Sequence, residues 1–323
     1  MDIPVLVVAG FLGAGKTTLL NHLLHTSDLR VGVVVNDFGK VNIDALTVAA
    51  QVDSMVSLGN GCLCCAVDPG ELDAMLDRLA QPDGPVDVIV IEASGLAEPP
   101  AMVKLVLASA NPNIRYGGLV EVVDAAEFTA TRKDHPRLDL HLRQADLVLL
   151  NKVDRAEPGV LELVRELAGE TPVVPTEFGR VDPDLLFDPV DRPDPVERQL
   201  SFEDLVEHGE HLHAGYTSVE FDTGIPLHPR RFARFLAERP PGLYRMKGFA
   251  WFARRDEPLG LQTVGAAVWA TEAADRPART TLVLIGANLD AEAIRAALES
   301  TETTAGEDVD PLDLLSITRY LPR

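Results

Sequence analysis

The hydrophobic and polar positions of the first half of the chain follow one repeated pattern. Continuous apolar runs occur at residues 3–8, 31–35, 86–91, 118–123 and 147–150, with weaker runs at 51–58 and 173–174. Helical spacing of apolar residues appears between them, at Leu19, Leu20, Leu23 and Leu24 and at Leu72, Met75, Leu76 and Leu79. Apolar strands that alternate with helices are typical of a mostly parallel sheet flanked by helices. The pattern therefore predicts an α/β domain.

The pattern changes in the second half of the chain. Residues 188–213 are rich in proline and acidic residues, which predicts a linker that few contacts cross. Beyond it, strands are predicted at residues 216–221, 243–252, 262–269 and 281–285, and helices at 229–238 and 291–298. We therefore predict three parts: an α/β domain at residues 1–187, an acidic Pro-rich linker at 188–213, and a smaller α+β domain at 214–323.

Composition limits the partners and the compartment. The 323 residues include 50 Asp and Glu against 29 Lys and Arg, which gives a formal net charge of -21. Nucleic acids and anionic membranes need a basic surface, so neither is expected as a partner. The apolar start of the chain ends at Lys16 and has no basic cluster before it, and no window approaches the ~18 apolar residues that span a bilayer. These features predict a cytoplasmic protein.

One segment reverses the acidic balance. Residues 230–255 contain one acid, Glu238, and eight basic side chains: Arg230, Arg231, Arg234, Arg239, Arg245, Lys247, Arg254 and Arg255. Such a basic stretch would dock an acidic partner or the chain's own acidic domain, and a solvated helix face is the simpler alternative.

A glycine-rich motif lies where the first strand meets the first helix. Gly10-x-x-x-x-Gly15-Lys16-Thr17 follows an apolar run, which is the context that a phosphate-binding loop (P-loop) requires. Backbone N–H groups and the helix N-terminus would bind phosphate, Lys16 would reach the β- and γ-phosphates, and Thr17 would hold Mg²⁺. The predicted nucleotide-binding residues here are Gly10, Gly13, Ala14, Gly15, Lys16, Thr17 and Thr18.

Acidic residues follow two further strands. Glu92 ends one apolar run, and a carboxylate there would join the Mg²⁺ shell while Gly95 offers its N–H to the γ-phosphate. Asp37 and Asp44 follow another run, at the edge where open parallel sheets bind ligands. We expect Asp37 and Asp44 to belong to a nucleotide switch, and we expect Asp37, Asp44 or a group from a partner to position the attacking water. A solvated turn is the alternative.

The three cysteines of the chain stand together at Cys62, Cys64 and Cys65, directly after Gly59-Asn60-Gly61. Such a cluster is not a disulfide framework. Thiolates are soft ligands that suit Zn²⁺, and this spacing can present two sulfurs to one metal ion. Three thiols leave a tetrahedral site one ligand short, so Asp37, a histidine, water or a client protein would supply the fourth. A buried or redox-active cysteine loop is the alternative.

A base-recognition motif follows the apolar run at residues 147–150. Asn151-Lys152-x-Asp154 places a carboxylate that can accept from the ring N–H and the exocyclic amine of guanine, a donor pair that adenine lacks. Lys152 would lie along the base, and Asn151 would brace the loop. Downstream of a P-loop, this motif favours a GTPase over a kinase or an ATPase.

Five motifs together resemble those of the CobW-type GTPases. They are, in chain order, Gly10-Phe11-Leu12-Gly13-Ala14-Gly15-Lys16-Thr17, Asn36-Asp37-Phe38-Gly39, Gly61-Cys62-Leu63-Cys64-Cys65, Glu92-Ala93-Ser94-Gly95 and Asn151-Lys152-x-Asp154. The resemblance extends past the linker, to Lys247-Gly248-Phe249-Ala250-Trp251 and Leu284-Ile285-Gly286. It implies GTP hydrolysis coupled to the handling of Zn²⁺ or Co²⁺, with the metal at the cysteine loop and delivery to a client metalloprotein.

The chain departs from the family pattern at two places. Members usually carry Glu where this chain has Asp37, and the shorter side chain alters the reach of that carboxylate toward a metal ion. The histidine tract that many members carry between their domains is reduced here to His208, His211 and His213. A polar linker is the simpler interpretation of these histidines, and a weak metal-collecting segment is the alternative.

These residues lead to one interpretation and one rival. The interpretation is a cytoplasmic, Mg²⁺-dependent GTPase whose nucleotide state controls how the cysteine loop holds Zn²⁺ or Co²⁺ for insertion into a client. The rival is a regulatory GTPase that activates a metalloenzyme by protein contact, with structural or redox-sensing thiols. A nucleotide-dependent homodimer is compatible with both.

Overall fold

The chain folds into two compact units. The computed structural model describes residues 2–27, 29–35, 54–57, 69–81, 86–93, 98–187, 216–273 and 276–321. The first unit contains Met1–Leu167 and Val174–Gly215, and the second contains Ala168–Val173 and Tyr216–Arg323. The linker predicted at residues 188–213 lies outside the described residues, so the domain boundaries stay predictions.

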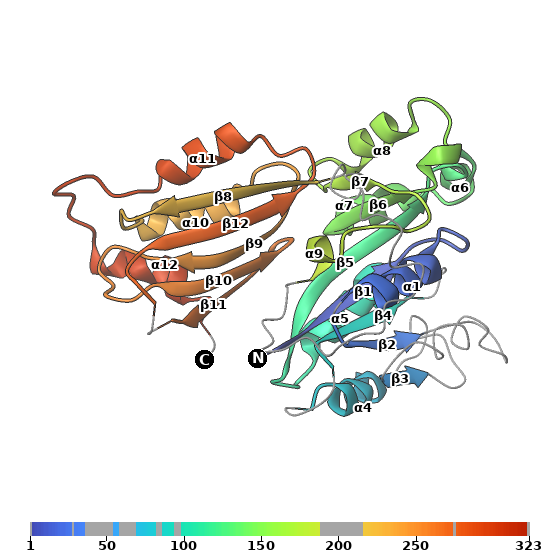
Figure 1. Ribbon diagram of the computed structural model, residues 1–323, viewed down its shortest axis with the longest axis horizontal. Coiled ribbons are helices and arrows are strands. Elements are labelled where there is room, and N and C mark those ends of the chain that lie inside the picture. The colour runs from blue at the N-terminus through green and yellow to red at the C-terminus, as the bar shows by residue number, and fades with distance from the viewer. Residues whose placement is uncertain are drawn as a thin grey trace. The chain divides into compact units, whose positions relative to one another are not determined.

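A seven-stranded sheet forms the centre of the first unit, in the order β3-β2-β4-β1-β5-β6-β7 (Figure 1). Its strands are β1 (Ile3–Ala9), β2 (Val31–Val35), β3 (Ser54–Ser57), β4 (Val88–Glu92), β5 (Ile114–Asp124), β6 (Leu147–Asn151) and β7 (Val173–Pro175). The flanking helices are α1 (Lys16–Thr26), α4 (Pro69–Leu79), α5 (Pro99–Ala108), α6 (Phe128–Asp134), α7 (Leu138–Gln144), α8 (Val160–Ala168) and α9 (Pro183–Leu186). A 3₁₀ turn, η1 (Val153–Arg155), follows β6.

The parallel arrangement confirms what the apolar runs predict. Strand β1 pairs with β4 on one side and β5 on the other, β2 pairs with β3 and β4, and β5 pairs with β6, all in parallel. Residues Val5 to Val8 of β1 are fully buried, and Leu19, Leu20 and Leu23 of α1 are buried as well. Each such side chain contributes about 1.5–3 kcal/mol of burial free energy. The core therefore fixes the strand whose end carries the P-loop.

The second unit is a five-stranded antiparallel sheet, in the order β11-β10-β9-β12-β8, with helices packed on it. Its strands are β8 (Thr217–Thr223), β9 (Leu243–Ala250), β10 (Leu259–Val264), β11 (Ala267–Glu272) and β12 (Thr280–Gly286). The helices are α10 (Pro229–Ala237), α11 (Ala291–Glu299) and α12 (Leu315–Thr318), with a 3₁₀ turn η3 (Pro311–Leu314). This arrangement confirms the predicted smaller α+β part.

The prediction of a single strand at residues 262–269 is wrong. The chain reverses at Gly265 and Ala266, so that β10 and β11 form an antiparallel hairpin in which Val264 pairs with Ala267. Gly265 has a φ of 54°, a left-handed conformation that suits a tight hairpin turn. The apolar residues on both sides of this glycine hide the turn, because the pattern runs through it unbroken.

Candidate functional site

Four strand ends meet at one edge of the parallel sheet. Strand β1 leads into the P-loop, and its two neighbours end in Glu92 on β4 and Asp124 on β5. Asn151 ends β6, the strand beside β5. Open α/β sheets bind ligands at the carboxyl ends of their strands. This edge is therefore the candidate functional site.

The P-loop ends in a glycine that no other residue can replace without strain. Gly15 is the N-cap of α1, with a φ of 107°, and a Cβ at this position would lie 2.3 Å from Asn151 Nδ2. No side chain caps the N-terminus of α1, and the first turn of the helix carries no acid. The backbone N–H groups of that turn and the positive end of the helix dipole therefore suit an anion, as the sequence predicts.

Lys16 folds back over its own loop. Its side chain is buried, and Nζ donates hydrogen bonds to the carbonyl oxygens of Gly10 at 2.9 Å and Phe11 at 3.3 Å. These bonds hold the ammonium group within the curve of the loop, where its positive charge would attract a bound phosphate.

Thr18, which follows Thr17 in α1, is exposed.

The two predicted Mg²⁺ ligands lie together although 75 residues separate them. Thr17 Oγ1 donates a hydrogen bond to Glu92 Oε1 at 3.3 Å, and Glu92 is only 6% exposed. A hydroxyl and a carboxylate are the oxygen ligands that Mg²⁺ takes in nucleotide sites. This pair of donors at the mouth of the P-loop therefore fits the ion, with Glu92 in place of the more usual Asp.

Asn151 joins two loops from the inside. It is fully buried, and its Nδ2 donates to the Ala14 carbonyl at 2.9 Å while its Oδ1 accepts from the Gly179 N–H at 2.9 Å. One side chain therefore connects the P-loop to the segment after β7. This is the bracing role that the sequence motif suggests, and the segment around Gly179 is a partner that the sequence does not identify.

Lys152 also reaches the P-loop. Its backbone is left-handed, with a φ of 62°, and Nζ donates to the Gly13 carbonyl at 2.8 Å and to Asp124 Oδ2 at 2.6 Å. Asp124 Oδ1 in turn accepts from the Ala126 N–H at 3.0 Å, so the carboxylate that holds Lys152 is itself fixed. The sequence places Asp124 at a strand end, the same signal that identifies Glu92, but gives it no role.

Asp154 lies on η1, two residues after Lys152, and its side chain is 30% exposed. Its Oδ2 is 3.4 Å from Nε of the neighbouring Arg155. A surface pair of this kind is weak, because water screens it. The carboxylate is therefore accessible to a planar donor such as the edge of a guanine base.

A buried carboxyl on β5 is the main surprise of this region. Glu121 is 1% exposed and lies opposite Ala9, the last residue of β1 before the P-loop. Its Oε2 has no hydrogen-bond partner in the described part of the chain. Burial raises the pKa of Glu121 to about 8, and the positive charge of Lys16 offsets only part of that effect. Periodicity alone misses it, because it interrupts an otherwise apolar strand.

Several predicted residues lie outside the described residues. They are Asp37, Asp44, Cys62, Cys64, Cys65, Gly95, His208, His211 and His213. Within the described ranges, no group of three or more His, Cys, Asp or Glu side chains could hold a metal ion. In the same ranges, no helix combines the length and the apolar character that a membrane crossing needs.

Four of the eight basic side chains of residues 230–255 pair with acids from their own unit. Arg231 contacts Glu307 at 2.6 Å, Arg230 contacts Asp313 at 2.8 Å, and Arg254 contacts Asp308 at 2.5 Å. Arg255 forms a similar pair with Glu272. For these four side chains, the second unit itself supplies the acidic partner.

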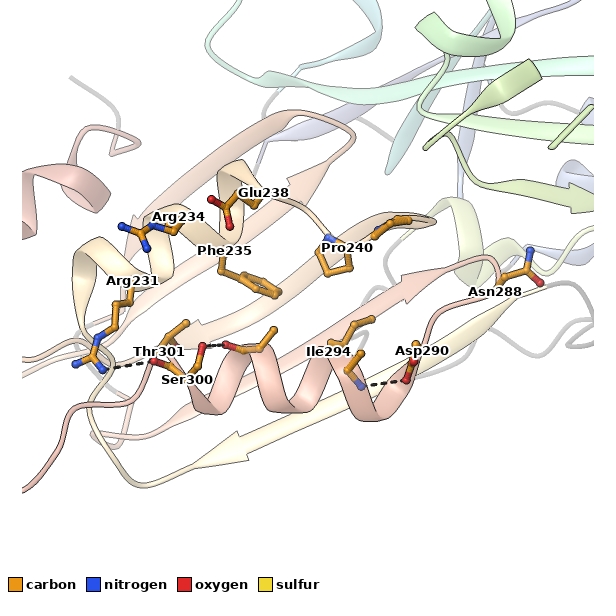
Figure 2. A pocket seen from close by; sticks show the side chains of 13 residues that line it. Arg231, Arg234, Phe235, Glu238, Pro240, Asn288, Asp290, Ile294, Ser300 and Thr301 are labelled. Carbon is orange, nitrogen blue, oxygen red and sulfur yellow. Dashed lines mark hydrogen bonds between the residues drawn. The ribbon is translucent and has the colours of Figure 1, made fainter. Parts of the chain in front are cut away.

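The hollow between α10 and α11 lies beside this stretch (Figure 2). It holds about 510 Å³ and presents Phe235, Pro240 and Ile294. Arg231, at one end, also donates to the Ser300 carbonyl at 3.4 Å. The hollow combines an apolar lining with charged side chains at its rim, and nothing in it matches the predicted chemistry.

Two sequence profiles match this chain. The profile "CobW/HypB/UreG, nucleotide-binding domain" matches residues 4–175. The profile "Cobalamin synthesis protein cobW C-terminal domain" matches residues 216–302.

Curated proteins are similar along most of the chain. The zinc chaperone CobW of Sinorhizobium sp is 32% identical over 349 residues, which cover 92% of this chain and 96% of that protein. The zinc chaperone YjiA of Escherichia coli (strain K12) is 29% identical over 309 residues, which cover 91% and 97% respectively. The zinc-regulated GTPase metalloprotein activator 1 of Schizosaccharomyces pombe is 29% identical over 194 residues, which cover 56% of this chain and 47% of that protein.

Proposed function

Because the chain belongs to the CobW family, we propose that it is a GTP-hydrolysing metallochaperone that binds Zn²⁺ or Co²⁺ and inserts it into a client protein. The observation that carries the proposal is the convergence of Asn151 and Lys152 on the P-loop, where each donates a hydrogen bond to a backbone carbonyl. These bonds join the phosphate-binding element to the element predicted to read the base. Zinc enters the proposal through the names of the relatives.

Guanine recognition is assigned to the segment after β6. Lys152 donates hydrogen bonds to Gly13 and Asp124, and these two bonds hold its aliphatic stem beside the P-loop. A base lying along that stem would bring its N–H and amine donors to the accessible Asp154 carboxylate. Asn151, which is buried and bonded to Ala14 and Gly179, would keep this geometry fixed during exchange of nucleotide.

Hydrolysis is assigned to the P-loop and to the end of β4, with Mg²⁺ as the resident cofactor. Thr17 and Glu92 would hold the ion, which when bound neutralises charge on the phosphates. Lys16 would turn from the carbonyls of Gly10 and Phe11 toward the β- and γ-phosphates. Asp37, Asp44 and Gly95 complete the proposal, with the two carboxylates orienting water and Gly95 donating to the γ-phosphate.

The cargo metal is assigned to the loop of Cys62, Cys64 and Cys65, with Asp37 as a candidate fourth ligand. The support is chemical: thiolates suit Zn²⁺, and a site short of one protein ligand can hand its metal to another protein. Because Asp37 follows β2 and belongs to the proposed switch, the γ-phosphate and the cargo would act on one segment. That arrangement would couple nucleotide state to metal affinity.

Guanine specificity has a direct test in Asp154→Asn. This variant should lose GTP affinity and gain affinity for xanthosine triphosphate, because the swapped side chain inverts one donor–acceptor pairing. Competition binding with GTP, ATP and xanthosine triphosphate measures both changes. Equal binding of ATP and GTP by the unmodified protein would contradict the assignment.

Coupling of the two sites is tested by metal titration. Zn²⁺ and Co²⁺ are titrated against a competing chelator with GDP and with a non-hydrolysable GTP analogue. A coupling of ~1–3 kcal/mol would shift metal affinity by about 5- to 150-fold, and metal must shift nucleotide affinity by the same factor. Cys64→Ala and Cys65→Ala should remove the shift and keep GTP binding. Asp154→Asn should keep basal metal affinity and lose the response to GTP.

The alternative function is a regulatory GTPase that activates a metalloenzyme by protein contact. The name of the activator relative favours it. In that case the thiols would be structural or redox-sensing, and metal would not be retained under reducing conditions. Elemental analysis of protein purified with a reductant separates the two: a stoichiometric metal that is lost in Cys64→Ala supports the chaperone, and its absence supports the activator.

A further inference from the structure

The segment after β7 contains an unusual tight turn. The Arg180 N–H donates to the Glu177 carbonyl at 3.0 Å, which closes a four-residue turn. Its two central residues, Phe178 and Gly179, have φ angles of 53° and 66°. Two positive φ angles are the mark of a type I′ turn, whose first central position favours Asn, Asp or Gly. A phenylalanine there is strained, and the strain calls for a physical reason.

Core packing does not supply that reason. The Phe178 side chain is 56% exposed, which is unusual for a large apolar residue. Its described ring contact is with Arg180, whose guanidinium carbon lies 5.8 Å from the ring centroid. The turn therefore holds an aromatic ring in a disfavoured backbone conformation and leaves half of it in water.

Neighbouring elements fix the turn in place. Thr176 N–H donates to the Leu150 carbonyl at 2.8 Å, and Val153 N–H donates to the Thr176 carbonyl at 3.4 Å. These bonds attach the start of the turn to the segment that carries the base-recognition motif.

The second half of the turn is fixed from below. Gly179 N–H is held by Asn151 Oδ1, and a Cβ on Gly179 would lie 2.8 Å from the Leu19 backbone nitrogen of α1. The close approach to α1 explains why this position is glycine. The bond from Gly179 to Asn151 ties the turn to the base-recognition motif, so the backbone of Phe178 is held next to that segment.

We propose that Phe178 is a base-binding residue that stacks on the base of the bound nucleotide, with the stem of Lys152 on the opposite face. The inference rests on the proposed function, because the ligand that it places on the exposed ring is the purine nucleotide of that function. A planar base would cover the part of the Phe178 ring that the fold leaves exposed. Base stacking on an aromatic ring is a general mode of recognition. Arg180 beside the ring adds positive charge near the same base.

The decisive variant is Phe178→Asn, because it separates the two roles of this position. Asparagine suits the left-handed turn, so the melting temperature of the nucleotide-free protein should rise. The same change removes the ring, so calorimetric GDP affinity should fall by about 5- to 150-fold, the range for the loss of one base–aromatic stack. Phe178→Tyr keeps the ring and should keep GDP affinity.

Pyrophosphate is the matched ligand, since it has no base. Its affinity should be the same in the unmodified protein and in Phe178→Asn. A lower melting temperature together with weaker pyrophosphate binding in Phe178→Asn would overturn the proposal, because the ring would then serve the fold. Unchanged GDP affinity in that variant would overturn it as well.

Failure of the inference is distinguishable from failure of guanine recognition. If the unmodified protein binds ADP as tightly as GDP, the role of Asp154 is wrong. The ratio of GDP affinities between the unmodified protein and Phe178→Asn still judges the stack, because every purine has a flat face.

Discussion

Polar side chains do different work in the two units. Around the P-loop, Asn151 and Lys152 send their hydrogen bonds to backbone carbonyls of a distant loop. In the second unit, Arg231 and its basic neighbours pair with acidic side chains of the same unit. In the first case a side chain sets the shape of a backbone that must meet a ligand. In the second it neutralises a charge at the surface.

Burial explains why the two arrangements differ in consequence. Asn151 is 1% exposed, so a lost bond leaves a polar backbone group without water. The Arg231 side chain is 34% exposed, so water replaces a lost partner. The charge and type of a residue alone do not reveal this difference. Substitutions at buried and at exposed polar residues measure it, and their expected effects run from large to small.

The largest effect is expected at the phosphates. Lys16→Ala and Thr17→Ala should each lower Mg²⁺-dependent GTP hydrolysis by at least about 100-fold, the usual cost of removing one transition-state contact. The circular dichroism spectrum should stay unchanged, since the hydrogen bonds that each side chain loses lie in the P-loop and at the end of β4. Lys104→Ala, on the exposed side of α5, is the matched control and should hydrolyse GTP normally. Normal turnover in Lys16→Ala would remove the P-loop from the reaction.

The second effect is a pH dependence carried by Glu121. Its raised pKa means that folding favours the protonated form, so stability is complete near the ordinary carboxyl pKa of 4.5 and falls as pH rises to about 8. At about 1.4 kcal/mol per pKa unit, the loss is on the order of a few kcal/mol.

Urea unfolding at pH 6 and pH 9 measures the part of this loss that falls above pH 6, where ordinary carboxyls do not titrate. Glu121→Gln cannot ionise and should lose less stability over that interval than the unmodified protein. Glu162→Gln, on the exposed face of α8, should behave like the unmodified protein. Equal pH dependence in all three proteins would mean that Glu121 is ionised when folded.

Asn151→Ala should produce the third effect. It removes the bonds to Ala14 and Gly179, and we expect a loss of about 2–4 kcal/mol in the free energy of unfolding. Affinity for GDP should fall too, because both loops lose their common anchor. Asn111→Ala removes an exposed bond to Asp77 and a half-buried one from the Asn113 N–H, and it should cost much less in the same urea titration because water can replace both partners. Equal losses in the two variants would deny the brace.

The smallest effect is expected for Arg231→Gln. The Thr304 N–H and then Arg231 hold the pKa of Glu307 below its ordinary value, so this pair stabilises the fold above the ordinary carboxyl pKa and stops doing so as pH falls through the lowered one. The melting temperature of Arg231→Gln should be lower than that of the unmodified protein at pH 7 in low salt, because the variant loses this pair. The difference should shrink as pH falls below the ordinary carboxyl pKa, and it should shrink in 1 M salt as well. A difference that stays the same under both conditions would indicate packing by the arginine stem instead.

The sequence predicts what is local and misses what is brought together by folding. The β1–P-loop–α1 succession and the strand end at Asn151 follow from apolar patterning and from glycine and polar residues at fixed places. The hairpin at Gly265 escapes the same reasoning, because apolar residues continue on both sides of it. Patterning shows where a strand runs but not where an apolar chain reverses.

At the site, the sequence predicts which residues belong together but not which groups each residue contacts. The motifs predict that Lys16, Thr17 and Glu92 belong to one site, and in the structure the Thr17 hydroxyl donates to the Glu92 carboxylate. The support of Lys152 by Asp124, the bond of Asn151 to Gly179 and the strained Phe178 do not follow, because each depends on the packing of distant strands. The burial of Glu121 likewise becomes visible only when β1 and β5 are paired.

The hydrogen bonds of Asn151 also determine when the P-loop can be completed during synthesis of the chain. Ala14 and Asn151 are 137 residues apart, so a P-loop that has left the ribosome waits for its brace through all the synthesis between them. At about 5–20 residues per second, that wait is roughly 7 to 27 seconds. Gly179 completes the brace 28 residues later still. Nucleotide in the cell therefore meets a competent site only after the first unit is almost entirely translated, and ligand binding can then lock a sheet whose central strand was made first.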